Sequence, residues 1–248
     1  MTPATETVVL LNSLATRAAL WDDVIRALPE HVVAVVFDQR DQQAGEAEAF
    51  TLDDMVADAV CALDERGVER AHVAGVSLGG IVALHAAATR PDRFASVTAM
   101  CCAARFPREV WIERAAAVRA EGVAPLAPAI LDRWFTAAFQ EAYPAVVERC
   151  AAMLAATPDE GYARACDLLA AADVRGELAG IAQPALIVSG EVDTANPVAH
   201  QEGIVAGIPG AAHAVVPGAG HLVPASHPDA VARLLVDHIG GRGDPTSR

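Results

Sequence analysis

A short apolar run ends in the pentapeptide G-V-S-L-G at residues 75–79, and a helical pattern follows it directly. This order predicts a strand, a sharp turn and a helix, with Ser77 in the turn. Small residues are needed there because the backbone of such a turn is strained and larger side chains would clash. The pentapeptide alone is just as typical of an ordinary strand-to-helix turn. It predicts a nucleophile only if an acid and a histidine follow later in the chain.

Apolar runs alternate with helical patterns through the first hundred residues and again after residue 184. Buried strands are predicted over residues 7–11, 31–37, 71–76, 95–102, 184–190 and 212–216. Strands separated by helices predict an α/β fold with a parallel sheet and right-handed connections. We also expect Ser226 to cap the last helix.

The segment 107–175 has a different pattern. It contains no strand-like run, its helical stretches are divided by prolines, and it holds six of the eleven aromatic residues. We predict a helical lid over residues 107–175, inserted in an α/β core domain of residues 1–106 and 176–248. Ligands of open α/β sheets bind at the C-terminal ends of the strands, so the lid is expected to cover that edge. For most of the aromatic side chains we expect packing between lid helices.

Two later residues complete a catalytic set with Ser77. Asp193 follows the strand at 184–190, and His221 lies in a glycine-rich loop after the last strand. A serine hydroxyl needs a histidine to take its proton, and a carboxylate to orient that histidine. The sequence therefore predicts a triad of Ser77, Asp193 and His221. The backbone N–H groups of Leu78 and Leu14 are the expected oxyanion hole, at the nucleophile and in the turn after the first strand.

Composition limits the partners of the chain. Its formal net charge is −14, which argues against nucleic acid and anionic membranes. No stretch of about 18 apolar residues predicts a membrane span, and the N-terminus lacks the basic start of a secretory signal. The five cysteines are odd in number and lack metal-ligand spacing, so we expect a reduced, cytoplasmic protein without metal or organic cofactor.

At this point the chain resembles the α/β-hydrolase superfamily, and more narrowly the 3-oxoadipate enol-lactonases. The segments that carry the resemblance are N-S-L-A-T at 12–16, G-V-S-L-G-G at 75–80, C-A-A-R at 102–105, R-W-F-T at 133–136, residues 190–197 and G-H-L at 220–222. The resemblance implies the triad above and places Arg133 and Trp134 towards the substrate. A guanidinium is also what a substrate carboxylate requires in a chain this acidic, and a solvated or ion-paired helix residue is the alternative for Arg133.

Three departures from the family pattern stand out. The family has two further strands before residue 7, so we expect about six strands here, with 31–37 at the edge. An apolar edge strand invites aggregation unless it is covered, which predicts a homodimer contact or an N-terminal arm on it. The loop that usually has the sequence D-x-R-G-H-G is D-Q-R-D-Q-Q at 38–43, and Ala15 replaces a glycine, which strains the turn if its φ is positive.

These features predict a serine hydrolase that opens a small carboxylated lactone or ester through an acyl-serine intermediate. An esterase, a thioesterase or a C–C hydrolase acting on another acyl group is the alternative among enzymes. A non-catalytic binding protein with the same fold is the alternative of another class. The altered loop and the missing strands favour the binding protein, and the intact triad argues against it.

Overall fold

A six-stranded sheet forms the centre of the molecule. The computed structural model describes residues 5–43 and 48–241. Within them all strand pairs are parallel and the order is β2-β1-β3-β4-β5-β6. The strands are β1 (Glu6–Leu11), β2 (Val32–Val35), β3 (Ala71–Val76), β4 (Phe94–Met100), β5 (Ala185–Gly190) and β6 (Ala212–Val216). The parallel sheet of about six strands is confirmed, and β2 lies at its edge as predicted, although it is shorter than the apolar run 31–37.

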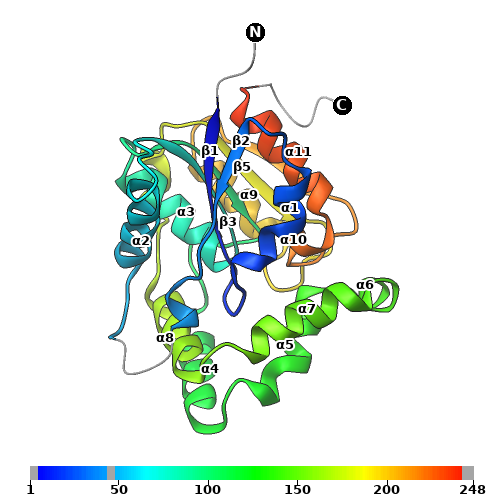
Figure 1. Cartoon of the computed structure of the whole chain (residues 1–248). Helices are drawn as coiled ribbons and strands as arrows, with labels where there is room; N and C mark the ends of the chain where they lie inside the picture. Colours follow the sequence, from blue (N-terminus) through cyan, green and yellow to red (C-terminus); the bar gives the residue numbers. More distant parts are fainter. Residues whose placement is uncertain (1–4, 44–47, 242–248) are drawn as a thin grey trace.

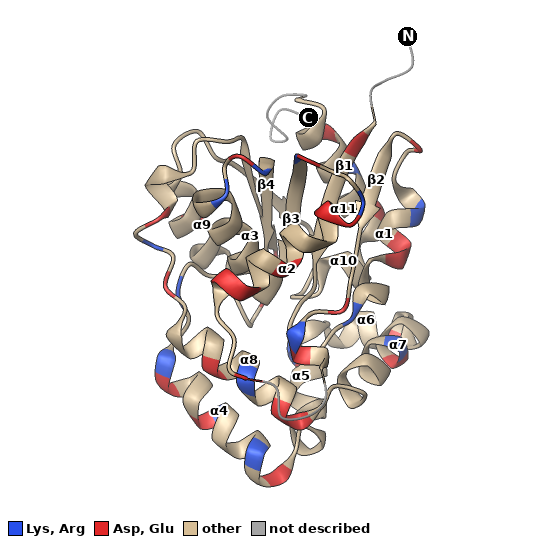
Figure 2. Ribbon diagram, turned by 60° about the vertical axis from the view of Figure 1, so that its left-hand side comes forward, with Lys and Arg blue, Asp and Glu red and all other residues tan. Residues whose placement is uncertain are grey.

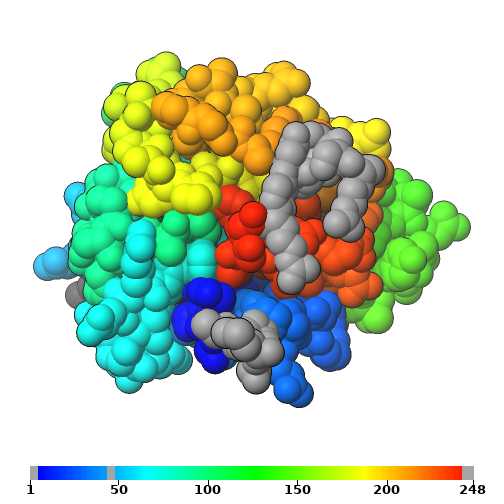
Figure 3. Space-filling view, turned by 90° about the horizontal axis from the view of Figure 1, so that it is seen from above, coloured from blue at the N-terminus to red at the C-terminus, as the bar shows by residue number. Residues whose placement is uncertain are grey.

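Helices cover both faces of the sheet (Figure 1). They are α1 (Asp22–Ala27), α2 (Leu52–Asp64), α3 (Leu78–Thr89), α9 (Val198–Gly207), α10 (Val223–Ser226) and α11 (Pro228–Ile239), with short 3-10 turns η1 (Ala18–Trp21), η2 (Arg40–Gln42) and η4 (Leu178–Gly180). Helices α2, α3 and α9 lie on one face and α1 and α11 on the other. Seen from above in Figure 3, the dark blue first strand and the red last helix are neighbours.

The apolar composition of α3 follows from its position. The helix packs against β1, β3 and β4 and also against α2, so residues 78–87 are all buried. Helix α2 is amphipathic and begins with a complete capping box, in which Thr51 and Asp54 satisfy each other's backbone N–H groups. The expected cap of the last helix is wrong. Helix α11 begins at Pro228, and the Ser226 hydroxyl donates to the Leu222 carbonyl instead.

A helical insertion between β4 and β5 lies under the C-terminal ends of the strands (Figure 1). Its elements are α4 (Arg108–Glu121), η3 (Ala124–Leu126), α5 (Ala127–Trp134), α6 (Ala137–Ala142), α7 (Pro144–Ala155) and α8 (Asp159–Ala171), which we call the lid. The chain leaves the core and returns to it at one place, because Val174 N donates to Ala104 O at 2.9 Å beside a bridge between Arg105 and Asp173.

Three of the six lid aromatics pack on one another, as expected, and the other three, Trp111, Trp134 and Tyr162, line the cavity described below. The Phe135 and Phe139 rings stack with centroids 5.2 Å apart, and Tyr143 lies 4.8 Å from Phe139. Acidic and basic residues are interspersed along α4 and α8 (Figure 2). Among the described residues, no helix is long and apolar enough to cross a membrane.

Candidate active site

Ser77 occupies a sharp turn between β3 and α3. Its φ of 57° lies in the left-handed region, which only close constraint imposes on a residue other than glycine. A Cβ atom on Gly75 would overlap the carbonyl oxygen of Gly79, and one on Gly79 would overlap that of Leu11. The two glycines of the pentapeptide therefore allow strand, turn and helix to pack at backbone contact. This packing presents the Ser77 side chain at the start of α3.

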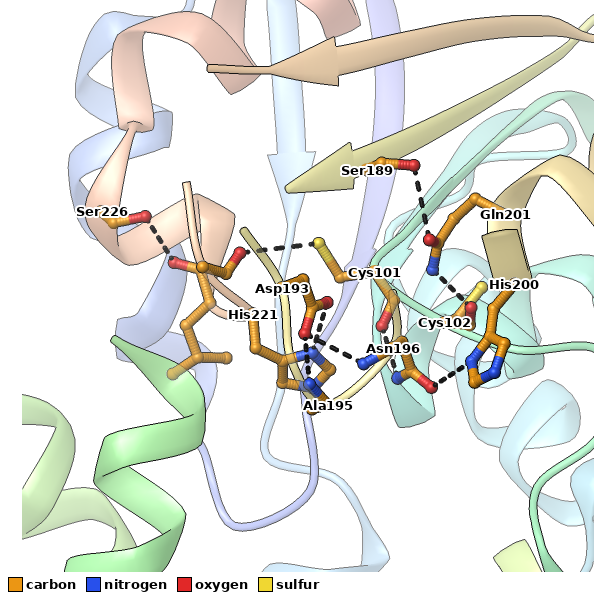
Figure 4. Close-up of polar contacts among 12 residues, drawn as sticks. Cys101, Cys102, Ser189, Asp193, Ala195, Asn196, His200, Gln201, His221 and Ser226 are labelled. Carbon is orange, nitrogen blue, oxygen red and sulfur yellow. Dashed lines mark hydrogen bonds and ion pairs between the residues drawn. The ribbon is translucent and has the colours of Figure 1, made fainter. Parts of the chain in front are cut away.

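Asp193 and His221 come together at the ends of β5 and β6, as the sequence predicts. The Asp193 Oδ2 atom lies 2.9 Å from His221 Nδ1, and both side chains are buried (Figure 4). An ionised carboxylate only accepts hydrogen bonds, so the proton of the neutral ring sits on Nδ1 and Nε2 is left as the basic atom. The other carboxylate oxygen accepts from the backbone N–H groups of Ala195 and Asn196 at 2.8 and 2.9 Å. The orientation of His221 is therefore set by a fully bonded acid.

Two side-chain amides hold the loop that carries Asp193, and the helix α9 that follows it, against the segment after β4. Asn196 Nδ2 donates to the Cys101 carbonyl at 2.9 Å, and Gln201 Nε2 donates to the Cys102 carbonyl at 2.6 Å (Figure 4). Burial raises the pKa of the Cys102 thiol to about 12 and that of Cys101 well above its usual range. Both thiols are therefore neutral near pH 7, which leaves Ser77 as the candidate nucleophile in this region.

The turn after β1 lies beside Ser77. Asn12 anchors it by donating to the Phe37 carbonyl at 2.9 Å and accepting from the Trp21 indole at 3.0 Å. Ala15 has a φ of 62°, so this position does require the left-handed conformation for which the family uses glycine. Leu14 lies in this turn and lines the same cavity as Ser77, as expected of an oxyanion-hole residue.

A cavity of about 230 Å³ separates this edge of the sheet from the lid. It brings together Ser77, His221, Leu14, Arg133 and Trp134, all of which were predicted. The other lining residues are Ser13, Phe106, Pro107, Val110, Trp111, Arg114, Ile130, Tyr162, Ala195, Asn196 and His200. None of these described lining residues is Asp or Glu, although the chain has a net charge of −14. The cavity is therefore a cationic, largely apolar pocket in an acidic protein.

Arg114 is a pocket residue that the sequence analysis missed. Its guanidinium lies over the Trp111 ring, 4.8 Å from the ring centroid, and both side chains line the cavity. In the described part of the chain neither Arg114 nor Arg133 forms an ion pair, whereas Arg40 and Arg119, for example, bind carboxylates. The i, i+3 spacing of Trp111 and Arg114 was visible in the sequence, but the direction of that helix face was not.

The lid also contacts the histidine loop directly. Leu222 N donates to the Trp134 carbonyl at 3.2 Å, and a Cβ atom on Gly220 would come within 2.9 Å of the same oxygen. Helix α5 therefore ends against the loop that carries His221. Over residues 5–43 and 48–241, no group of three or more His, Cys, Asp and Glu side chains is arranged to hold a metal ion.

Comparison with known proteins agrees with this architecture. Residues 8–234 match the alpha/beta hydrolase family. The chain belongs to this family. Among curated hydrolases of the family, it is 37% identical over 188 residues to 3-oxoadipate enol-lactonase 1 of Acinetobacter baylyi, an alignment that covers 75% of this chain and 71% of that one. It is 32% identical over 194 residues to enol-lactonase 2 of the same organism, with 77% and 73% covered.

Solved structures of alpha/beta hydrolases extend the match to nearly the whole chain. The enol-lactonase from Burkholderia xenovorans LB400 is 34% identical and superposes with a TM-score of 0.89, covering 96% of this chain and 92% of that one. The lid is part of this agreement, because a superposition of such extent includes the insertion between β4 and β5.

Proposed function

We propose that this alpha/beta hydrolase opens a small carboxylated lactone or ester through an acyl-Ser77 intermediate. The observation that carries the proposal is the cavity lined by Ser77, His221 and two arginines that form no ion pair with any carboxylate of residues 5–43 or 48–241. The similarity to enol-lactonases supports the same substrate class. Ligand pockets for drug-sized molecules usually have volumes of about 300–1,000 Å³, so a cavity below that range favours a compact acyl group.

The proposed reaction uses the triad in two steps. His221 Nε2 takes the Ser77 proton as Oγ attacks the lactone carbonyl carbon, and the N–H groups of Leu14 and Leu78 stabilise the resulting oxyanion. The carbonyl–ring oxygen bond then breaks, and His221 returns the proton to the departing oxygen, which stays attached to the acyl chain. In the second step His221 deprotonates a water molecule that attacks the acyl ester. The product carries a new carboxylate, and Ser77 regains its proton.

Arg133 and Arg114 are proposed to bind the carboxylate that the substrate carries before its ring is opened. A guanidinium offers paired donors that fit a carboxylate, and the half-buried position of Arg114 strengthens this attraction relative to water, whereas Arg133 is exposed. The two side chains come from different lid helices, α5 and α4, so the lid would select the acyl group while the core breaks the bond.

The test compares 3-oxoadipate enol-lactone with the primary amide of its free carboxylate, which keeps the ring and loses the charge. We expect kcat/KM to be roughly 10- to 100-fold higher for the acid, the value of one or two charge-assisted hydrogen bonds. Equal rates would argue for an esterase, thioesterase or C–C hydrolase without carboxylate recognition. No turnover of either compound or of an activated phenyl ester would favour the binding protein.

Arg133→Gln and Arg114→Gln are each expected to raise KM for the acid roughly 10- to 100-fold, because each removes a charge-assisted donor pair. The amide substrate should respond little to either change. Arg108→Gln is the matched control, since Arg108 is exposed on α4 and does not line the cavity. Steady-state kinetics of the three variants on both substrates measures the effect. An equal loss on acid and amide would assign the arginines to lid packing instead.

A further inference from the structure

The loop at residues 38–43 departs from the family pattern and touches the oxyanion turn. Asp41 stands where the pattern D-x-R-G-H-G has its first glycine, and its side chain is fully buried. Its Oδ2 atom accepts from the backbone N–H of Ala15 at 2.8 Å. Ala15 itself replaces a glycine and has a positive φ, which costs an alanine about 1 kcal/mol or more. Two of the three departures from the family pattern, Asp41 and Ala15, are therefore joined by one hydrogen bond.

This hydrogen bond fixes half of the turn that presents Leu14. The Ser13 carbonyl accepts from Thr16, from the backbone N at 3.1 Å and from the hydroxyl at 2.8 Å. The carbonyl and the following N–H of a trans peptide point in opposite directions, so these bonds direct the Leu14 N–H away from Thr16. The next peptide, which carries the Ala15 N–H, is held by Asp41. Both peptides that flank Leu14 are therefore pinned, one by Thr16 and one by Asp41.

The same loop also contacts the lid. Gln42 Nε2 donates to Asp41 Oδ2 at 3.0 Å and to the Thr157 hydroxyl, just after α7, at 3.1 Å. A Cβ atom on Gly161 of α8 would overlap the Asp41 carbonyl oxygen, so the helix lies directly on the loop backbone. The adjacent residue on α8 is Tyr162, which lines the cavity. Asp41 therefore lies between the oxyanion turn and the helix that carries part of the pocket wall.

A buried carboxyl group without a cation is costly to keep in a fold. The charged groups near Asp41 are engaged elsewhere. Asp38 pairs with Arg17 at 2.9 Å, Arg40 binds Asp58 at 2.6 Å, and Arg164 donates to the Gln43 carbonyl at 3.3 Å. The second carboxyl oxygen of Asp41, Oδ1, has no hydrogen-bond partner among the described residues. The hydrogen bonds that the Asp41 side chain does make are to the oxyanion turn and to its neighbour Gln42.

We propose that Asp41 is a positioning residue, which holds the left-handed Ala15 so that the Leu14 N–H points at the reacting carbonyl oxygen. The proposal rests on the function proposed above, because it concerns the oxyanion hole of that reaction. In the family pattern a glycine adopts the left-handed conformation freely at this position. Here the hydrogen bond from Ala15 to Asp41 would hold an alanine in that conformation. Asp41 touches no substrate and acts only through Leu14 and Ala15.

The test is a cycle of substitutions at positions 41 and 15. Asp41→Ala is expected to lower kcat for an activated ester roughly 10- to 100-fold with KM nearly unchanged, since oxyanion donors act in the transition state. Asp41→Asn, whose amide oxygen still accepts from Ala15, should keep most of the activity. Ala15→Gly in the Asp41→Ala background should recover part of the loss, because glycine adopts the left-handed conformation unaided. Glu48→Gln, which neutralises an exposed carboxylate seven residues after Asp41 in the sequence, is the control and should leave kcat unchanged.

Each outcome of the cycle is informative. A kcat of Asp41→Ala within twofold of the wild type overturns the proposal. So does a loss that neither Asn at position 41 nor Gly at position 15 relieves. If Asp41→Ala does not fold, Asp41→Asn and the double variant still decide the question. If the wild type itself has no esterase activity, the proposed function fails, and amide hydrogen exchange at Ala15 tests the hydrogen bond without turnover. Exchange that does not accelerate in the double variant, relative to Ala15→Gly alone, would overturn it.

The burial of the Asp41 carboxyl group can also be tested through the pH dependence of stability. Burial raises the pKa of Asp41 from 3.8 to about 6, and the nearby Asp38 charge adds to this shift. The native state then binds this proton more tightly than the unfolded chain does. The stability contributed by the protonated carboxyl is present below pH 4 and is lost as the pH rises through 6. The Tm of Asp41→Asn should therefore rise relative to wild type by roughly 5–10 °C between pH 4 and pH 7.5. A constant difference across this range would show that Asp41 ionises normally.

Discussion

Replacing Ser77 with alanine is expected to lower kcat roughly 10⁴- to 10⁶-fold, the largest kinetic effect of any single change in this chain. The substitution removes the atom that forms the acyl intermediate and leaves the fold intact, because alanine is smaller than serine. Binding of the lactone should survive, since the arginines and the oxyanion hole remain. Intact-mass measurement after treatment with a fluorophosphonate gives the direct readout. One adduct is expected on the wild type and none on Ser77→Ala.

Ser96→Ala is the matched control for this experiment. Ser96 is also buried, but it lies near the start of β4, at the opposite ends of the strands from the site. Its hydroxyl contacts the His72 ring at 2.7 Å there. This variant should keep both the adduct and the rate. A folded Ser77→Ala protein that still accepts the label, or still opens the lactone at more than a hundredth of the wild-type rate, would contradict the assignment of Ser77.

Gly79→Ala is expected to have the largest effect on folding. A methyl group at this position would overlap the carbonyl oxygen of Leu11 and press on that of Asn12, and both are backbone atoms of a buried strand end. Neither β1 nor α3 can move without separating the sheet from its central helix. We expect a loss of about 4–5 kcal/mol or more in the free energy of unfolding, as for other severe overpacking. Urea unfolding followed by circular dichroism measures it.

Gly203→Ala separates this steric effect from the general response of a helix to loss of glycine. Gly203 is exposed in the middle of α9, and no atom lies within 4 Å of a Cβ placed there. Alanine at 203 should stabilise the protein by about 0.5–1 kcal/mol, because it restricts the unfolded chain. A Gly79→Ala variant that unfolds at the same urea concentration as the wild type would mean that the turn relaxes around the methyl group.

The sequence was informative where one residue type is the only one that fits. Gly75 and Gly79 are required by backbone contact, and the turn they flank could be recognised from five letters. The parallel sheet followed from the alternation of apolar runs with helical patterns, since strands buried on both faces need no polar alternation. The proximity of Asp193 and His221 followed from topology, because parallel strands end at the same edge of a sheet.

The sequence was less informative where contacts depend on how separate segments approach each other. Arg114 lines the pocket because α4 turns one face towards the sheet, and its i, i+3 neighbour Trp111 fits lid packing equally well. The altered loop at 38–43 indicated a change near the site. The change itself, a buried carboxyl group that accepts a hydrogen bond from Ala15, depends on how the loop packs against both the turn and α8. No local sequence pattern predicts that packing.

The single crossing point between core and lid has a consequence for how such proteins diversify. The chain leaves the core at Ala104 and returns to it at Val174, and these two residues are neighbours. The helices between them can therefore be replaced as one unit without a change in the order of the strands. Such a replacement must still match the core where the two touch, for example at the Trp134 carbonyl on the histidine loop and at Gly161 on the Asp41 backbone. Substitutions in the lid can thus change which acyl group binds, while the catalytic residues in the core stay the same.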